Sequence, residues 1–165
     1  MIRRMTREAL AWDLRPAKAD DRPFLVEMAR AACTLEGRRL PPADDQSVLA
    51  LLPRSDADAL VAAHRNGRLL GAAWWFVAES PLALDSDGRP LPELVMAVVR
   101  EERGKGIGGA LVGALADKAA GRFPALVLNV HLLNPAVRLY VRQGFRVAGA
   151  GRGELGVAMT RVLDS

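Results

Sequence analysis

A run of glycines between an apolar segment and a helix-like segment constrains the fold of this chain more than any other feature. The apolar run Leu94–Val98 precedes a basic, glycine-rich stretch, Arg103–Gly109, and Ala110–Ala120 follows with the composition of a helix. Glycines allow successive backbone N–H groups to point at one spot, and a helix N-terminus adds partial positive charge there. The pattern predicts a strand, an anion-binding loop and a helix, with a phosphate-bearing ligand at the loop.

Length and composition favour a single globular domain. The chain has 165 residues, of which 50% are hydrophobic and 25% are charged, enough for one buried core. A net charge of +4 and a pI near 10.0 admit an anionic partner. The basic residues are scattered, however, and only 5% of residues are aromatic, which argues against nucleic acid. No segment is long and apolar enough for a membrane span, so we expect neither nucleic acid nor membrane as a partner.

Cysteine and histidine are too few for a disulfide or a metal centre. Cys33 is the single cysteine, and His64 and His131 stand far apart, so we expect no metal. The start of the chain is basic but lacks the apolar stretch of a secretion signal. We therefore expect a basic, disordered extension over residues 1–10, one domain over residues 11–165, and a cytoplasmic protein.

A β-hairpin is the clearest local structure ahead of the glycine loop. Asn66-Gly67, which favours a tight type I′ turn, separates Ala59–His64 from Arg68–Val77. The second arm is almost wholly apolar and so predicts a central strand. Trp74 and Trp75 then point to opposite faces, one into the core and the other into a substrate groove.

Two other glycine-loop chemistries fit less well. Gly104, Gly106 and Gly109 match the spacing of a dinucleotide-binding turn, but Arg100–Arg103 intervenes between the strand and the first glycine. The next strand also ends Asn129-Val130-His131, without the acidic residue that holds a ribose. A P-loop needs Ser or Thr after its lysine, and here a glycine follows Lys105.

A third interpretation covers more of the chain. Ala97–Gly108 resembles the signature of the GCN5-related N-acetyltransferases (GNAT), in which an apolar strand and a polar turn lead to Arg-x-x-Gly-x-Gly and a helix. Asn134–Phe145 resembles their second signature, an Asn-led helix with Leu-Tyr and a closing Gly-Phe. The resemblance runs from Trp12 to Leu163. It implies an α/β fold with a mixed, mostly antiparallel central sheet of six to seven strands, flanked by about four helices.

The resemblance also implies a reaction. An acetyl group passes from acetyl-CoA directly to a primary amine, without metal, in a homodimer. The strand ending at Val98 splays from its neighbour, the amide of Val98 faces the thioester oxygen, and Tyr140 is the general acid for the departing thiolate. Asn134 caps its helix and contacts the cofactor. The residues expected to bind coenzyme A are Ala97, Val98, Val99, Arg103, Gly104, Lys105, Gly106, Ile107, Gly108, Gly109, Asn134 and Tyr140.

The general base does not follow the family pattern. The glutamate that many members carry five residues ahead of Ala97 is replaced here by Pro92. Glu93 is the candidate, but it is one residue off, which turns its side chain to the other sheet face unless a bulge intervenes. A water relay and His131 are the alternatives. The missing glutamate also leaves open a non-catalytic acyl-CoA sensor of the same fold, and failure to bind coenzyme A would revive an NAD-dependent oxidoreductase.

The acceptor is an unidentified small-molecule or peptide amine. We expect the loops Glu36–Pro42 and Glu79–Pro92 to wall its groove. Cys33 is interpreted as a small hydrophobe rather than an acyl carrier. The carboxylates that could attract a cationic acceptor, or that are simply solvated loop charge, are Glu36, Glu79, Asp85, Asp87 and Glu93.

Overall fold

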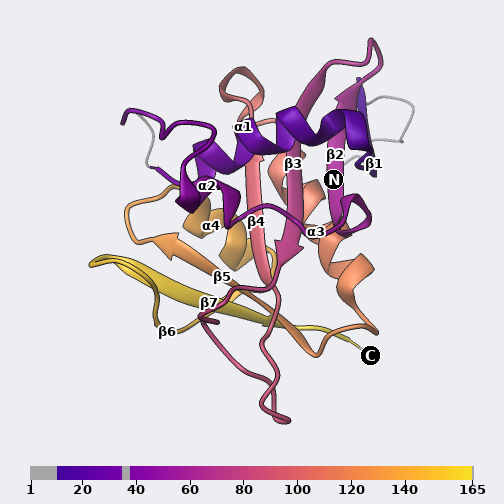
Figure 1. Ribbon diagram of the computed structural model, residues 1–165. Coiled ribbons are helices and arrows are strands. Elements are labelled where there is room, and N and C mark those ends of the chain that lie inside the picture. The colour runs from indigo at the N-terminus through magenta and orange to yellow at the C-terminus, as the bar shows by residue number, and fades with distance from the viewer. Residues whose placement is uncertain (1–10, 35–37, 165) are drawn as a thin grey trace.

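One seven-stranded sheet with helices on both faces forms the domain (Figure 1). The computed structural model describes residues 11–34 and 38–164, so the predictions for residues 1–10 and for Glu36 lie outside it. The strands are β1 (Trp12–Pro16), β2 (Ala59–His64), β3 (Leu69–Phe76), β4 (Glu93–Val98), β5 (Ala125–His131), β6 (Arg146–Ala150) and β7 (Gly156–Val162). The α-helices are α1 (Arg22–Ala32), α2 (Gln46–Leu49), α3 (Ile107–Ala119) and α4 (Ala136–Arg142).

The strand order is β1-β2-β3-β4-β5-β7-β6, and every neighbouring pair is antiparallel except β4 and β5. Helix α1 crosses one face of β2–β4, whereas α3 lies behind the same strands (Figure 1). The expected mixed, mostly antiparallel sheet is therefore confirmed.

The β2–β3 hairpin lies where the sequence predicts it, but its turn is not type I′. Gly67 takes a φ of 91°, whereas a type I′ turn also needs a positive φ at Asn66, and among the described residues only glycines have one. The N–H of Gly67 instead donates to the His64 carbonyl at 2.8 Å. Because β3 is central, its alternate side chains enter two different cores: Trp74 packs on the α1 side and Trp75 on the α3 side. Both indoles are buried, so the expectation that one of them lines a substrate groove is wrong.

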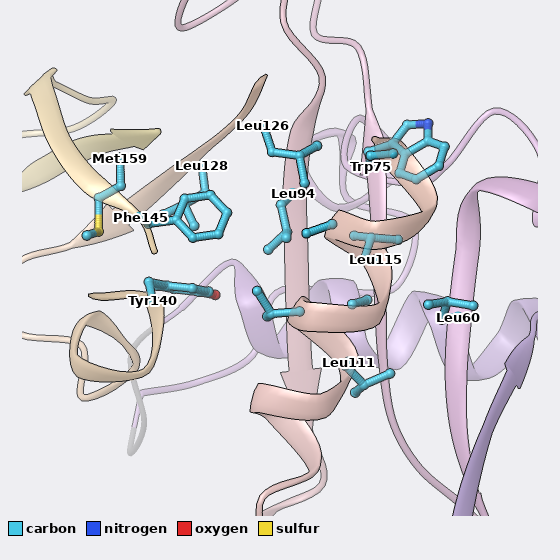
Figure 2. Packing of buried hydrophobic residues seen from close by; sticks show 14 of the residues in the cluster. Leu60, Trp75, Leu94, Leu111, Leu115, Leu126, Leu128, Tyr140, Phe145 and Met159 are labelled. Carbon is cyan, nitrogen blue, oxygen red and sulfur yellow. The ribbon is translucent and has the colours of Figure 1, made fainter. Parts of the chain in front are cut away.

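Three apolar clusters hold the layers together. The largest joins α3, through residues such as Leu111 and Leu115, to the sheet and to Tyr140 of α4 (Figure 2). The second packs α1 on the opposite face. In the third, Leu82 and Leu91 of the long β3–β4 connection pack on β5 and β7, so this connection covers part of the sheet as well as facing solvent.

The sheet divides between β4 and β5. These parallel strands pair only at Glu93 and Val127, near the start of both. Beyond that point β4 stays paired with β3, and β5 stays paired with β7 up to His131. The predicted splay is confirmed, and the edge of β4 from Leu94 to Val98 pairs with no strand in the part of the chain that the structure describes.

Helix α3 includes the end of the glycine stretch. It starts at Ile107, because Gly106 with φ 86° turns the chain straight into the helix. The Gly106 carbonyl accepts a 3.1 Å hydrogen bond from the N–H of Ala110. Part of the glycine stretch is therefore the first turn of α3.

Candidate active site

A cavity of about 1800 Å³ follows the gap between β4 and β5. Consecutive residues of β4, whose side chains alternate between the two faces of the sheet, all line it, so the cavity passes through the sheet. Pockets for one small ligand typically have about 300–1,000 Å³. The volume therefore suits two reactants meeting at the splay.

The cavity has two ends that are built differently. The loop end is lined by Val98 and by residues of the Arg103–Gly109 stretch. The apex end, where β4 and β5 meet, is lined by Glu93, Ser80 and Arg152.

Backbone groups of β4 face the loop end. The N–H of Val99 donates to the Leu70 carbonyl of β3 at 2.8 Å. Alternate residues of an antiparallel strand face the same neighbour, so the amides of Val98 and Met96 point the other way, into the cavity. The Val98 carbonyl accepts a 3.3 Å hydrogen bond from Arg103 Nε. The Val98 amide therefore faces the cavity; its contact with a thioester oxygen stays a prediction of the family resemblance.

The glycine loop presents a series of free backbone donors. None of the N–H groups from Gly104 to Gly109 donates to any described residue. Gly104 and Gly106 both have φ near 80°, at 77° and 86°, which turns these amides toward one side ahead of α3. Unpaired amides at a helix N-terminus are suited to an anion, and a phosphate at this loop stays the prediction made from the sequence.

Some of the charged side chains around the loop form ion pairs with one another. Lys105 Nζ lies 3.0 Å from Glu102 Oε2, and Arg68 binds the other oxygen of Glu102. The hydrogen bond from Lys105 lowers the pKa of Glu102. Arg103 lines the cavity and Lys105 does not, so of the two expected cationic contacts only Arg103 is in place.

Glycines of α3 bring α4 close to β4. A Cβ on Gly108 would lie 2.9 Å from Leu139 Cδ1, and one on Gly113 would lie 3.2 Å from Gln143 Oε1. A Cβ at either position would require the Leu139 or Gln143 side chain to shift. Gly108 thus serves helix packing, a role that the motif alone did not separate from ligand contact.

This close approach places Tyr140 at the cavity. The phenol packs edge-on against Phe145, with ring centroids 5.9 Å apart, and its hydroxyl points from α4 toward β4 (Figure 2). Burial raises the pKa of Tyr140 above its ordinary value. The hydroxyl has no hydrogen-bond partner among the described residues, yet no described side-chain N or O is both buried and unpartnered. The hydroxyl therefore reaches the open cavity.

Asn134 has the predicted capping contact. Its Oδ1 accepts a 2.9 Å hydrogen bond from the N–H of Ala136, the first residue of α4. Asn134 also lines the cavity, next to Tyr140 and Leu139. The cap fixes the start of α4 and thereby the position of Tyr140 one turn later.

At the apex end, Glu93 forms an ion pair that the sequence analysis missed. The carboxylate is 2% exposed, and Arg152 binds both of its oxygens, at 2.6 and 2.8 Å. The β3–β4 register has no shift, so there is no bulge, and the Glu93 side chain shares the face of Val95 and Ala97. It still reaches the cavity, because the cavity crosses the sheet here. Two glycines around Arg152 were the only sequence signal of this contact.

Other candidates at this end are only partly brought together. Arg38 and Leu40 of the first loop and Glu79 and Ser80 of the second line the cavity, as expected of its walls. Asp85 does not, since its carboxylate accepts hydrogen bonds from Asp87 and Arg89 of its own turn.

His131 and Cys33 differ in their access to the cavity. His131 lies outside its lining, and its Nδ1 accepts from the N–H of Leu133 at 3.1 Å, which leaves it badly placed for a base. Cys33 is half-buried in the wall, and burial raises the pKa of its thiol. A thiol of this kind is a poor nucleophile.

Comparison with known proteins identifies the family. The acetyltransferase (GNAT) domain family matches residues 56–147, which include β2 to β5, the glycine loop and α4. The chain belongs to the GNAT acetyltransferases. A GCN5-related N-acetyltransferase from Kribbella flavida has the same fold, with a TM-score of 0.68 and 26% identity over 93% of this chain and 98% of its own.

One further solved structure and one sequence relative are also similar to this chain. A GNAT superfamily phosphinothricin acetyltransferase from Sinorhizobium meliloti, solved in complex with acetyl-CoA, matches in fold with a TM-score of 0.66 and 24% identity, over 94% of this chain and 90% of its own. Mycothiol acetyltransferase of Acidothermus cellulolyticus is 36% identical over 100 residues, which cover 55% of this chain. The chain matches only 31% of the length of that relative.

Two further properties bear on the partners. Among the described residues, no helix has the length and apolarity to cross a membrane. Residues 11–34 and 38–164 also contain no group of three or more His, Cys, Asp or Glu side chains placed to hold a metal ion.

Proposed function

We propose that this GNAT acetyltransferase moves the acetyl group of acetyl-CoA directly to a primary amine. The unpaired edge of β4 carries the proposal, since it runs from the apex of the splay to the anion-binding loop. An extended pantetheine arm that paired with this edge would place its pyrophosphate on the amides of Gly104–Gly109. The acetyl-CoA complex of the Sinorhizobium meliloti enzyme supports the choice of donor.

The proposed chemistry uses one backbone and one side-chain donor. The amine nitrogen attacks the thioester carbon, and the N–H of Val98 donates to the carbonyl oxygen as negative charge develops on it. The C–S bond then breaks, and Tyr140 gives its proton to the departing sulfur. The phenol is protonated at neutral pH at its ordinary pKa near 10, and burial, which raises the pKa of Tyr140, does not change this.

The proton lost by the amine has two possible acceptors. Both oxygens of Glu93 already bind Arg152, and protonating this buried carboxylate would leave a guanidinium without its counter-charge. We therefore propose that water takes the proton, and keep Glu93 as the competing base. If Glu93 is the base, Glu93→Gln lowers kcat by about 100-fold or more. If water takes the proton, kcat stays within about tenfold, while the KM for the amine rises.

The ion pair of Glu93 also favours one alternative, a non-catalytic acyl-CoA sensor. Thiol release from acetyl-CoA, measured with a panel of amines, separates enzyme from sensor. The panel includes spermidine, phosphinothricin and an alanine-led peptide. The enzyme releases thiol in proportion to acetylated amine; a sensor binds acetyl-CoA and releases none. A chain that bound no acetyl-CoA would contradict both.

A homodimer and a cytoplasmic location complete the proposal. Strand β6 is the outer edge of the sheet, and all five of its residues are exposed. Val147 and Val162 are 66% and 81% exposed beside this edge. Edge strands of this kind pair readily with a second chain. Light scattering of the purified chain tests the dimer, and a monomer at all concentrations would contradict it.

A further inference from the structure

Two buried carboxylates among the described residues are each held by an arginine, and they differ in what they join. Asp21 is 6% exposed and Glu93 is 2% exposed. Arg15 binds Asp21 at 2.7 and 3.0 Å, only six residues away in the chain, and neither residue lines the cavity. Arg152 binds Glu93 across 59 residues, at the apex end of the cavity.

Arg152 connects four segments of the chain. Besides both oxygens of Glu93, its Nη2 donates to the Ser80 carbonyl of the β3–β4 connection at 2.7 Å. Its backbone N–H donates to Asn129 Oδ1 of β5, also at 2.7 Å. Arg152 itself lies in the β6–β7 turn, residues 151–155. One residue thus ties this turn to β4, to β5 and to the long connection.

Backbone hydrogen bonds also hold the turn: the N–H of Gly151 donates to the Gly156 carbonyl at 2.9 Å, and the N–H of Leu132 donates to the Leu155 carbonyl at 3.0 Å. Apolar packing adds little to these polar contacts. Every residue of β6 is exposed, and none of its side chains enters an apolar cluster of the core. Two glycines permit the close approach: a Cβ on Gly151 would collide with Asn129 Oδ1, and one on Gly156 would collide with the Arg152 carbonyl oxygen. A segment with few buried apolar contacts depends on its polar contacts for position.

We infer that Arg152 is a positioning residue that fixes the β6–β7 turn as the amine-facing wall of the apex end, with Glu93 as its anchor. The guanidinium side chain is 41% exposed while the carboxylate is 2% exposed, so the pair runs from the core to the cavity surface. Naming this wall as amine-facing rests on the proposed function.

The first experiment needs no substrate. Amide hydrogen exchange of residues 151–156 is measured in the unmodified chain, in Arg152→Gln, and in the matched control Arg15→Gln. Losing charge-assisted hydrogen bonds should speed exchange in the turn by about tenfold or more in Arg152→Gln. The control should leave the turn unchanged. Unchanged protection in Arg152→Gln would overturn the inference.

The second experiment measures KM for both substrates, using the fastest amine of the panel. Arg152→Gln should raise the KM for the amine about tenfold and leave the KM for acetyl-CoA within about twofold. Arg152→Lys, which keeps the charge without the two-point contact, should restore part of the loss. A turn that loosens while the KM for the amine stays unchanged would overturn its role as a wall.

A double variant covers the case in which Arg152→Gln does not fold. Glu93→Gln/Arg152→Gln removes both charges and leaves no buried carboxylate without a partner. It should show the same faster exchange and the same rise in amine KM. If the unmodified chain releases no thiol with any amine, the proposed function fails and the amine-facing role falls with it. Hydrogen exchange still decides whether Arg152 holds the turn.

Discussion

The two ends of the cavity are made of different parts of the protein. The loop end consists of backbone: the amides of Gly104–Gly109 and the free edge of β4 that ends at Val98. The apex end consists of side chains, with Glu93 and Arg152 in contact across 59 residues. Backbone donors suit a group common to many reactions, such as a pyrophosphate. Side chains vary from protein to protein, so the apex end is where an acceptor would be selected.

Tyr140 separates catalysis from folding most clearly, because its hydroxyl makes no hydrogen bond with any described residue. Tyr140→Phe should lower kcat by about a thousandfold, within the range for loss of a general acid. Binding of acetyl-CoA and the melting temperature should not change, because the ring still packs against Phe145. Stopped-flow thiol release and calorimetric binding measure the two effects. An unchanged kcat would leave Tyr140 with a packing role alone.

A single added side chain at Gly106 should disrupt binding at the loop end. Gly106 has φ 86°, and a Cβ there would point into open space. Gly106→Val should weaken acetyl-CoA binding by about 100-fold, because the strained backbone turns its amides away from the anion.

Gly67→Val is the matched control for this loop variant. Gly67 has φ 91° and equal space around it, but it lies in the β2–β3 turn. Both variants should lose similar stability, about 1–2 kcal/mol, and only Gly106→Val should lose binding. Equal affinities in the two variants would contradict the loop assignment.

The apex end should respond unequally to loss of either charge. Arg152→Gln strands a carboxylate that is 2% exposed and should cost about 2 kcal/mol of unfolding free energy, less than for a wholly buried pair. Glu93→Gln leaves a guanidinium that is 41% exposed, which water can solvate, and should cost less than about 1 kcal/mol. Urea unfolding of both variants measures the difference. Equal losses of unfolding free energy in the two variants would contradict the role of the buried Glu93 carboxylate as the anchor of the pair.

The Asp21–Arg15 pair offers a test by pH away from the cavity. The hydrogen bond from Arg15 lowers the pKa of Asp21 below its ordinary value near 4. A lowered folded pKa means that the pair stabilises above pH 4 and that this stability is lost as the pH falls below it. Arg15→Gln should lower the unfolding free energy by about 1 kcal/mol at pH 7. The variant should also lose less stability than the unmodified chain as the pH falls below about 4, and neither KM should change. A change in KM would contradict the separation of this pair from the site.

The smallest effect is expected at Cys33. The thiol lies in the cavity wall. In a direct transfer from acetyl-CoA to the amine, however, the thiol takes part in no step. Cys33→Ala should leave kcat and both KM values within about twofold. Loss of turnover, with an acetylated cysteine detected by mass spectrometry in the unmodified chain, would replace direct transfer by a two-step reaction.

Local patterns predicted part of the loop end. The glycines and the Asn134 cap act within a few residues, whereas Tyr140 and the splay beside Val98 followed from the family resemblance. The apex end depended on distant contacts. Nothing near Glu93 in the sequence indicates Arg152, and the burial of both tryptophans reflects helices on both faces of β3 rather than the pattern of β3 itself.

The most direct test of the account is amide hydrogen exchange of the unmodified chain with and without acetyl-CoA. We predict that acetyl-CoA protects the amides of Met96, Val98 and Gly104–Gly109, while the amides of residues 151–155 exchange as before. Protection confined to residues 151–155, or saturable binding without protection at Val98 and the loop, would contradict it.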